Sequence, residues 1–193
     1  MPGVMSAEDM ANVDFDKFDF SDSKFGMLIG DPARPFYAMF WGKPGQGKST
    51  AVLQLSRYFA SVHGTVLYVS GEEYGSATLK MNLNRQGGPV PGLYFGSGID
   101  AIGPISGPSG RFTPDVVVLD SITSLDMKIE EFRALKKAHP SISFVLIFQS
   151  TKAGQFKGEN TWSHEVQTVI EVDGGIAKTN KNRFKELTET KIF

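Results

Sequence analysis

The stretch FWGKPGQGKST, from Phe40 to Thr50, decides the fold of this chain. It closes an apolar run, FYAMFWG, that is typical of a buried strand, and helical spacing follows it. Its glycines let backbone amides turn toward an anion without a side chain in the way. The spacing Gly-x-x-x-x-Gly-Lys-Ser predicts a phosphate-binding P-loop between a strand and a helix. The four fixed places are Gly42, Gly47, Lys48 and Ser49.

The P-loop pattern predicts a bound nucleoside triphosphate, taken as ATP, together with Mg²⁺. Lys48 is expected to reach the β- and γ-phosphates, and the Ser49 hydroxyl is expected to ligate Mg²⁺. The helix that begins near Lys48 directs its positive end at the same phosphates. The alternative is a glycine-rich turn that binds nothing. The expected nucleotide-binding residues are Gly42, Lys43, Pro44, Gly45, Gln46, Gly47, Lys48, Ser49 and Thr50.

An acidic residue is expected on the far side of the metal. Asp120 ends the apolar run DVVVLD, about 70 residues after Lys48. A carboxylate at such a strand end can hold Mg²⁺ opposite Ser49. The pattern also occurs in strands that simply end at an acidic turn.

Apolar runs alternate with segments of helical spacing after about residue 35. This alternation predicts an α/β fold with a mainly parallel central sheet and helices on both faces. The glycine- and proline-rich residues 96–110 are expected to form a loop. Strands are expected at 36–42, 65–70, 92–97, 115–120, 141–149, 167–172 and 175–180, and helices at 48–63, around 79–83 and at 125–139.

The amino-acid composition of the chain excludes some classes of function and makes others less expected. The 193 residues include no cysteine, which excludes disulfides and cysteine-ligated zinc, and the three histidines are scattered. Twenty basic and twenty-one acidic residues argue against a generally cationic nucleic-acid binder, but a local basic patch stays possible. The sequence has no apolar run of membrane length and no signal-peptide pattern, so a cytoplasmic location is expected.

Residues 1–34 differ from the single domain expected over residues 35–193. Within them, VDFDKFDFSDSKF (13–25) interleaves phenylalanines with aspartates. The phenylalanines need burial, either on their own domain or on a neighbouring subunit. We therefore expect an acidic, phenylalanine-rich N-terminal arm.

Four segments together resemble the RadA/Sms branch of the RecA-like P-loop ATPases. They are LYVSGEEYGSATLK (67–80), PDVVVLDSITSL (114–125), FQSTKAGQFKGENTWSHEVQTVIEV (148–172) and KNRF (181–184). The resemblance covers about residues 38–184, and SGEE and KNRF are its discriminating elements. It implies a three-layer RecA-like ATPase core. The zinc module and protease-like domain of the branch have no counterpart here, so a bare ATPase core is expected.

The resemblance implies catalytic roles for two residues besides Lys48. Glu72 matches the glutamate that polarises the attacking water, and Glu73 is its nearest alternative; both could also be a solvated acidic turn. Gln149 matches the position that senses the γ-phosphate. RadA proteins commonly carry histidine there and RecA carries glutamine.

Residues 150–163 resemble the DNA-facing loop of the family. Lys152 and Lys157 are expected to meet backbone phosphates, and Phe156 and Trp162 are expected to stack on bases. Single-stranded DNA is therefore the expected partner. A mobile polar loop is the alternative.

The resemblance further implies that Lys181 and Arg183 complete the nucleotide site of a neighbouring subunit, in the manner of an arginine finger. That role requires a homo-oligomer, either a ring or a filament. A basic strand end in water is the alternative. The family motif continues with glycine where Lys185 stands, so the family's backbone turn is not carried over to this position.

The leading hypothesis is a Mg²⁺-dependent ATPase of the RecA superfamily that couples ATP hydrolysis to single-stranded DNA binding in recombination, repair or replication. A second hypothesis is a nucleotide-gated binding or scaffold protein with little hydrolysis. A third is the core of a hexameric helicase motor.

Overall fold

The computed structural model describes residues 3–103, 105–107, 110–150 and 160–193, and its centre is an eight-stranded sheet. The strand order is β10-β9-β8-β1-β7-β6-β2-β3, and neighbours from β8 to β3 run parallel. Within the residues described, the antiparallel pairs of this sheet are β8 with β9 and β9 with β10. The bounds are β1 (Tyr37–Gly42), β2 (Val66–Ser70), β3 (Leu93–Gly96), β6 (Val116–Asp120), β7 (Ser143–Gln149), β8 (Thr168–Asp173), β9 (Ile176–Asn182) and β10 (Glu189–Lys191).

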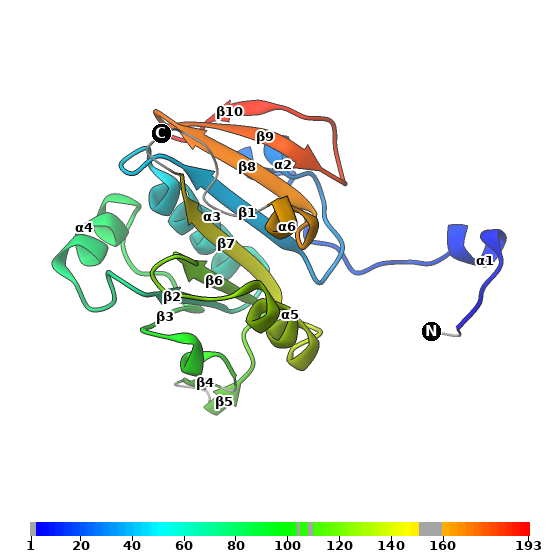
Figure 1. Cartoon of the computed structure of the whole chain (residues 1–193), viewed down its shortest axis with the longest axis horizontal. Helices are drawn as coiled ribbons and strands as arrows, with labels where there is room; N and C mark the ends of the chain where they lie inside the picture. The colour runs from blue at the N-terminus through cyan, green and yellow to red at the C-terminus, as the bar shows by residue number, and fades with distance from the viewer. Residues whose placement is uncertain (1–2, 104, 108–109, 151–159) are drawn as a thin grey trace.

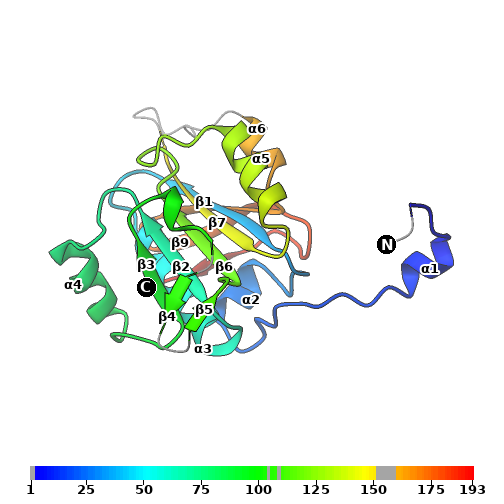
Figure 2. The ribbon, with the colours of Figure 1, turned by 90° about the horizontal axis from the view of Figure 1, so that it is seen from below.

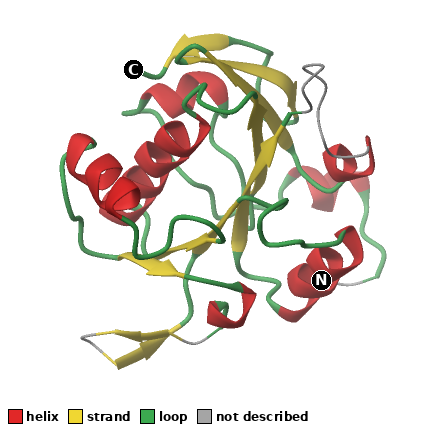
Figure 3. Ribbon diagram, turned by 60° about the vertical axis from the view of Figure 1, so that its left-hand side comes forward, coloured by secondary structure: helices red, strands yellow, loops and turns green. Residues whose placement is uncertain are grey.

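Helices cover both faces of the sheet, which confirms the expected three-layer α/β architecture (Figures 2 and 3). Successive residues of a strand point to opposite faces. In β1, Ala38 and Phe40 pack with α3 (Lys48–Val62) and α2 (Lys24–Leu28), whereas Met39 packs with α5 (Ile129–Ala138) and α6 (Asn160–His164). The parallel strands are therefore apolar on both sides, as their sequences predict.

The helices begin and end at the expected signals. Gly47 caps α3 in the left-handed conformation, and Gly64 follows the end of the helix with φ of 131°. Ser76 caps α4 (Ala77–Arg85) by accepting a hydrogen bond from the Leu79 amide at 3.0 Å. The helix expected from residue 125 begins later, at Ile129, because residues 121–126 form turns.

Residues 96–110 contain more structure than the expected loop. They hold a 3₁₀ turn, η1 (Ile99–Ala101), and much of a small antiparallel hairpin built from β4 (Ile105–Gly107) and β5 (Gly110–Phe112). The hairpin stands apart from the main sheet (Figure 1).

The N-terminal segment divides into two parts. Phe18, Phe20 and Phe25 are buried against α3, so these three rings complete the core of their own domain. Residues 3–14, which include the short helix α1 (Ala7–Ala11), extend away from the domain in two perpendicular views (Figures 1 and 2). There Val4 is 89% and Met10 50% exposed.

Parallel pairing places several strand ends at one edge of the sheet. Gly42 at the end of β1 is in register with Gln149 of β7, and Ser70 of β2 is in register with Asp120 of β6. Ligands of open α/β sheets bind at this carboxyl edge. None of the helices in the described part of the chain is both long and apolar enough to cross a membrane.

Candidate functional site

The backbone of residues 42–48 forms a cradle at the carboxyl edge. A Cβ on Gly42 would lie 2.2 Å from the Val172 carbonyl oxygen, so no side chain fits there. Gly45 and Gly47 have φ of 78° and 95°, which glycine alone adopts without strain. Gly47 makes no side-chain cap for α3, so the amides of its first turn are available to an anion.

Lys48 reaches across this cradle. Its residue is only 7% exposed, and its Nζ donates a hydrogen bond of 2.8 Å to the Lys43 carbonyl oxygen. Burial lowers the pKa of Lys48, while the nearby Asp120 charge opposes that shift. A cation desolvated in this way interacts strongly with any anion that enters the cradle.

Asp120 lies at the end of β6, where Ser49 and a buried tyrosine contact its carboxylate. The Tyr68 hydroxyl donates to Asp120 Oδ2 at 2.5 Å, and Ser49 lines the same cavity beside this carboxylate. Burial raises the pKa of Asp120, and the Tyr68 hydrogen bond, the nearby Ser49 hydroxyl and the Lys48 charge oppose that shift. Ser49 and Asp120 are thus brought together as oxygen donors suited to Mg²⁺. Sequence reasoning missed Tyr68, whose only signal was an aromatic residue inside a buried strand.

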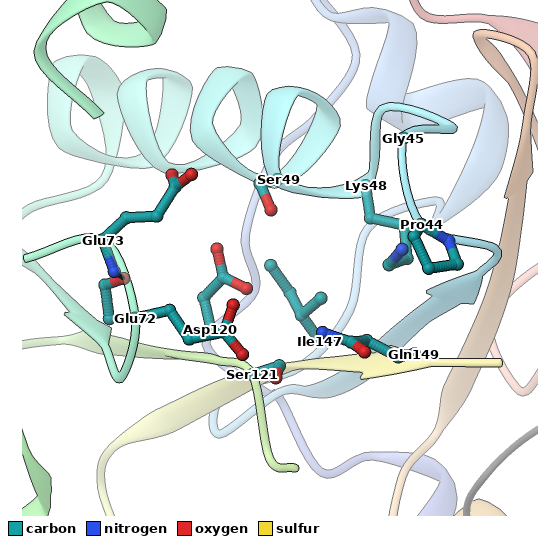
Figure 4. Close-up of a pocket in the computed structure, with 11 residues that line it drawn as sticks. Pro44, Gly45, Lys48, Ser49, Glu72, Glu73, Asp120, Ser121, Ile147 and Gln149 are labelled. Atoms are coloured by element: carbon teal, nitrogen blue, oxygen red, sulfur yellow. Dashed lines mark hydrogen bonds between the residues drawn. The ribbon is translucent and has the colours of Figure 1, made fainter. Parts of the chain in front are cut away.

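Glu72 and Glu73 occupy the turn that follows β2. Both line the cavity that holds Lys48 and Asp120. The Glu73 amide donates to Ser70 Oγ at 2.9 Å, and burial, followed by the charges of Asp120 and Glu72, raises the pKa of Glu73. Figure 4 shows the Glu72 carboxylate directed toward Asp120 and the Glu73 carboxylate directed toward α3.

Gln149 closes the cavity from β7. It follows the buried strand SFVLIF, and the next amide, Ser150 N, donates to the Gly42 carbonyl oxygen at 3.0 Å. The end of β7 is therefore tied directly to the start of the P-loop. The residues that line this cavity are Pro44, Gly45, Lys48, Ser49, Ser70, Glu72, Glu73, Asp120, Ser121, Ile147 and Gln149 (Figure 4).

Lys181 and Arg183 lie away from this cavity. Strand β9 runs antiparallel to β8, so its end at Asn182 is at the sheet edge opposite the P-loop. Lys181 Nζ donates to the carbonyl oxygens of Ser163 and Val166 at 2.5 and 2.7 Å. Burial and the Arg183 charge lower the pKa of Lys181, while Arg183 itself is exposed. Their action on a neighbouring subunit stays a prediction.

The expected DNA-contacting residues Lys152, Phe156 and Lys157 lie outside the described residues. The expectation that Trp162 stacks on bases is wrong for this conformation. Trp162 is 8% exposed and packs in the core, with ring centroids 5.6 Å from Phe132 and 5.0 Å from Phe148. In the sequence, a tryptophan within a polar segment suggests a DNA-contacting loop. In the structure, Trp162 belongs to α6 and packs on the face of the sheet that α5 covers.

Two further parts of the chain lie beside the P-loop, and the sequence analysis assigned neither of them to the site. The Gly174 amide, in the turn between β8 and β9, donates to Gln46 Oε1 at 2.7 Å. The ring of Phe193 lies against the P-loop, because a Cβ on Gly47 would fall 2.1 Å from its Cζ. The glycine pair Gly174–Gly175 was the signal for the turn, and nothing in the sequence marked Phe193.

Comparison with known sequences identifies relatives that are longer than this chain. It is 28% identical to the DNA repair protein RadA of Streptococcus pneumoniae, over 98% of this chain and 49% of the relative. It is 31% identical to the DNA repair protein RadA of Bacillus subtilis, over 86% of this chain and 40% of the relative. The chain thus spans less than half the length of these relatives. No model of a protein family matches it.

Solved structures match the fold at low sequence identity. The flagellar accessory protein FlaH of Methanocaldococcus jannaschii has a TM-score of 0.56 and 14% identity, over 93% of this chain and 96% of that one. A KaiC-like protein of Pyrococcus horikoshii has a TM-score of 0.53 and 15% identity, over 87% and 89% of the two chains. With its P-loop cradle and its RadA relatives, the chain belongs to the RecA-like P-loop ATPases of the RadA branch.

Proposed function

We propose that this chain is a Mg²⁺-dependent ATPase that couples ATP hydrolysis to single-stranded DNA binding in recombination, repair or replication. The observation that supports it best is the convergence of Lys48, Ser49, Asp120, Glu72 and Gln149 on one cavity. A cation, two metal donors, a carboxylate and an amide are the groups that phosphoryl transfer to water uses. The RadA relatives, which are named as DNA repair proteins, support the biological role.

Ser49 and Asp120 are the residues that would hold Mg²⁺. They fit a hard cation because both offer oxygen, and because burial makes the Asp120 charge costly without a positive partner. When bound, Mg²⁺ supplies charge neutralisation on the β- and γ-phosphates. The chain's own contribution is to fix the two donors, and Tyr68 does this for Asp120 through its hydrogen bond.

Lys48 and the P-loop amides bind and orient the phosphates, and Glu72 acts on the attacking water. Its carboxylate would accept a proton from that water as the nucleophile forms. The direction of Glu72 toward Asp120, where the terminal phosphate is expected, favours it over Glu73 (Figure 4). Gln149 can donate to a γ-phosphate oxygen and release it after hydrolysis.

The coupling to DNA is proposed to run from Gln149 into residues 150–163. Gln149 ends β7, and the proposed DNA contacts Lys152, Phe156 and Lys157 follow it directly in sequence. A change at the strand tip therefore has a short covalent path to the DNA-facing segment.

We further propose a homo-oligomer in which Arg183 and Lys181 of one subunit complete the site of the next. Their place at the sheet edge opposite the P-loop fits such a head-to-tail contact. The projecting residues 3–14, with Val4 and Met10 exposed, are proposed to pack on a neighbouring subunit. Ring and filament both fit this description.

The direct test is ATP hydrolysis by the full chain, titrated with single-stranded DNA and Mg²⁺. We expect turnover that DNA stimulates and that Lys48→Ala abolishes, with Lys137→Ala as the matched control because Lys137 is an exposed lysine of α5 outside the cavity. ATP binding without turnover would replace the proposal with a nucleotide-gated binding protein. Strand displacement on forked DNA would assign a helicase motor instead.

A further inference from the structure

The turn that follows Asp120 packs against the turn that carries Glu72. Strands β2 and β6 pair in parallel up to Ser70 and Asp120, and the Gly71 amide extends this pairing by donating to the Asp120 carbonyl oxygen at 2.8 Å. Glu72 follows that contact by one residue. The packing of the two strand tips therefore decides where its carboxylate lies.

The Ser124 hydroxyl holds the backbone of Ser121, the residue after Asp120. It accepts a hydrogen bond from the Ser121 amide at 2.9 Å and donates to the Ser121 carbonyl oxygen at 3.0 Å. In return, the Ser121 hydroxyl accepts from the Ser124 amide at 3.2 Å and donates to Ser124 Oγ at 3.1 Å. Ser121 is only 4% exposed, so these bonds are sheltered from water. Ser124 thus fixes the tip of β6.

The same hydroxyl oxygen contacts the tip of β2. A Cβ on Gly71 would lie 2.7 Å from Ser124 Oγ and 3.2 Å from the Ser124 carbonyl carbon, so glycine provides the space for this close approach. Ser121 and Glu72 line the first cavity (Figure 4), whereas Ser124 is not one of the described residues that line it. Ser124 therefore supports both tips without entering the site.

We infer that Ser124 is a positioning residue for hydrolysis, because it joins the tip of β6 to the turn after β2 and so sets where the Glu72 carboxylate lies relative to Asp120. The inference rests on the proposed function, which gives Glu72 the attacking water and Asp120 the metal. A general base must lie within hydrogen-bond reach of the proton that it accepts. A displacement of about 1 Å can cost about a hundredfold in rate.

Serine suits this position for two reasons. Its oxygen is small enough to lie against Gly71, and a hydroxyl can accept and donate at the same time. Alanine would remove the oxygen that contacts both tips and would leave a gap beside Gly71. We therefore expect Ser124→Ala to loosen the turn that carries Glu72 while the P-loop stays intact.

The experiment compares the wild type with Ser124→Ala in the full chain. Calorimetry measures the affinity for a non-hydrolysable ATP analogue with Mg²⁺, and steady-state assays measure kcat and its dependence on Mg²⁺. Thr123→Ala is the matched control, because Thr123 is an exposed hydroxyl residue of the same turn. Single-turnover hydrolysis then compares Glu72→Gln with and without Ser124→Ala. Thermal melting checks that each variant is folded.

We expect Ser124→Ala to lower kcat about tenfold. The analogue affinity and the Mg²⁺ concentration for half-maximal activity should change less than about twofold, because Lys48 and Asp120 are kept. Thr123→Ala should match the wild type. In the Glu72→Gln background, Ser124→Ala should cause no further loss, because the carboxylate that it positions is gone. A purely structural role would lower hydrolysis in both backgrounds.

Gly71→Ala tests the same contact from the other turn. Its Cβ would collide with Ser124 Oγ, so the turn that carries Glu72 should shift and kcat should fall at least about tenfold. Ser124→Ala removes the colliding oxygen, so the double variant should lose less than the product of the two single losses. This variant also keeps the inference testable if Ser124→Ala does not fold.

Four results would overturn the inference. An unchanged kcat in Ser124→Ala, or in Gly71→Ala, would show that the contact does not set the position of Glu72. A further tenfold loss in the Glu72→Gln background would show that Ser124 acts elsewhere, and a Mg²⁺ requirement raised more than about twofold would show that it acts on Asp120 instead. If the wild type did not hydrolyse ATP, the proposed function would fail first, and the role of Ser124 with it.

Discussion

The hydroxyl of buried Tyr68 donates a 2.5 Å hydrogen bond to Oδ2 of Asp120. Tyr68 is 1% exposed, and its strand β2 pairs directly with β6, which ends at Asp120. Burial raises the pKa of Asp120, and this hydrogen bond is the largest effect that opposes the rise. Tyr68 therefore both orients the carboxylate and favours its charged, metal-binding form.

Replacing Tyr68 with phenylalanine tests this role. Loss of the hydroxyl should raise the pKa of Asp120 and free its orientation, so the Mg²⁺ concentration for half-maximal ATPase activity should rise about tenfold. The free energy of unfolding should fall by about 1 kcal/mol. The control is Tyr74→Phe, because Tyr74 is 54% exposed. A Mg²⁺ requirement identical to that of the wild type would show that Tyr68 only fills space.

Asp120 also makes the stability of the ligand-free chain depend on pH. Because its pKa is raised above the ordinary value of 3.8, the folded chain holds this proton more tightly than the unfolded chain. That contribution to stability is full below about the unfolded pKa and is lost as the pH rises through the folded pKa. At pH 7 the charged carboxylate therefore weakens the ligand-free fold.

Asp120→Asn should reverse this effect, since asparagine is uncharged and its amide oxygen can still accept from Tyr68. We expect the free energy of unfolding at pH 7 without ligand to rise by about 1 kcal/mol, and stabilisation by Mg²⁺-ATP to disappear. Denaturant unfolding at several pH values measures both, with Asp100→Asn as an exposed control. A variant less stable than the wild type at pH 7 would contradict the argument.

Glu72→Gln should separate binding from turnover. The amide keeps the size of the side chain but cannot accept the proton of the attacking water, so kcat should fall at least about a hundredfold. ATP affinity should stay within about twofold, because the P-loop and Lys48 are unchanged. Glu73→Gln is the matched control. If Glu73→Gln stopped turnover and Glu72→Gln did not, the two glutamates would exchange roles.

Much of the fold and of the first cavity could be predicted because the signals are local. A P-loop needs its glycines at fixed spacing, and a buried strand that ends in Asp120 or Gln149 places a polar side chain at the carboxyl edge. Parallel pairing then brings these tips together without further information.

The remaining features of the site depend on packing between segments that are far apart in the sequence. Such packing cannot be predicted from a single sequence. Tyr68 reaches Asp120 only because β2 and β6 are neighbours, and Phe193 lies against Gly47 only because the last residues of the chain return to the P-loop. Trp162 lies in a polar stretch of sequence that resembles a DNA-contacting loop, but its ring is buried in the core beside α5. Lys181 was expected to reach the nucleotide of a neighbouring subunit, and within its own chain its amine donates to two carbonyl oxygens that the sequence did not point to.

Removing residues 1–14 should weaken oligomer formation without unfolding the domain. This segment extends from the body, and the core rings Phe18, Phe20 and Phe25 remain in the shortened chain. We expect the mean mass in sedimentation with ATP, Mg²⁺ and DNA to fall toward the monomer, while the melting temperature stays within about 2 °C. An unchanged mean mass would exclude the arm from the interface.

Completion of one subunit's site by its neighbour can be tested by mixing two inactive variants. Arg183→Ala removes the proposed finger and Glu72→Gln removes the proposed base, so each variant alone should hydrolyse ATP at no more than about 1% of the wild-type rate. In mixed oligomers, a subunit that keeps Glu72 can meet a neighbour that keeps Arg183. With random mixing this intact pairing occurs at about one interface in four, so activity should reappear on mixing.

Arg183 is the better residue for this mixture than Lys181. Lys181→Ala would also remove the hydrogen bonds to Ser163 and Val166, and we expect it to lower the free energy of unfolding by about 2 kcal/mol. Exposed Arg183→Ala should change stability by less than about 0.5 kcal/mol. Recovery therefore reports on the interface and not on folding. A mixture as inactive as its parts, at concentrations where sedimentation shows mixed oligomers, would confine Arg183 to its own subunit.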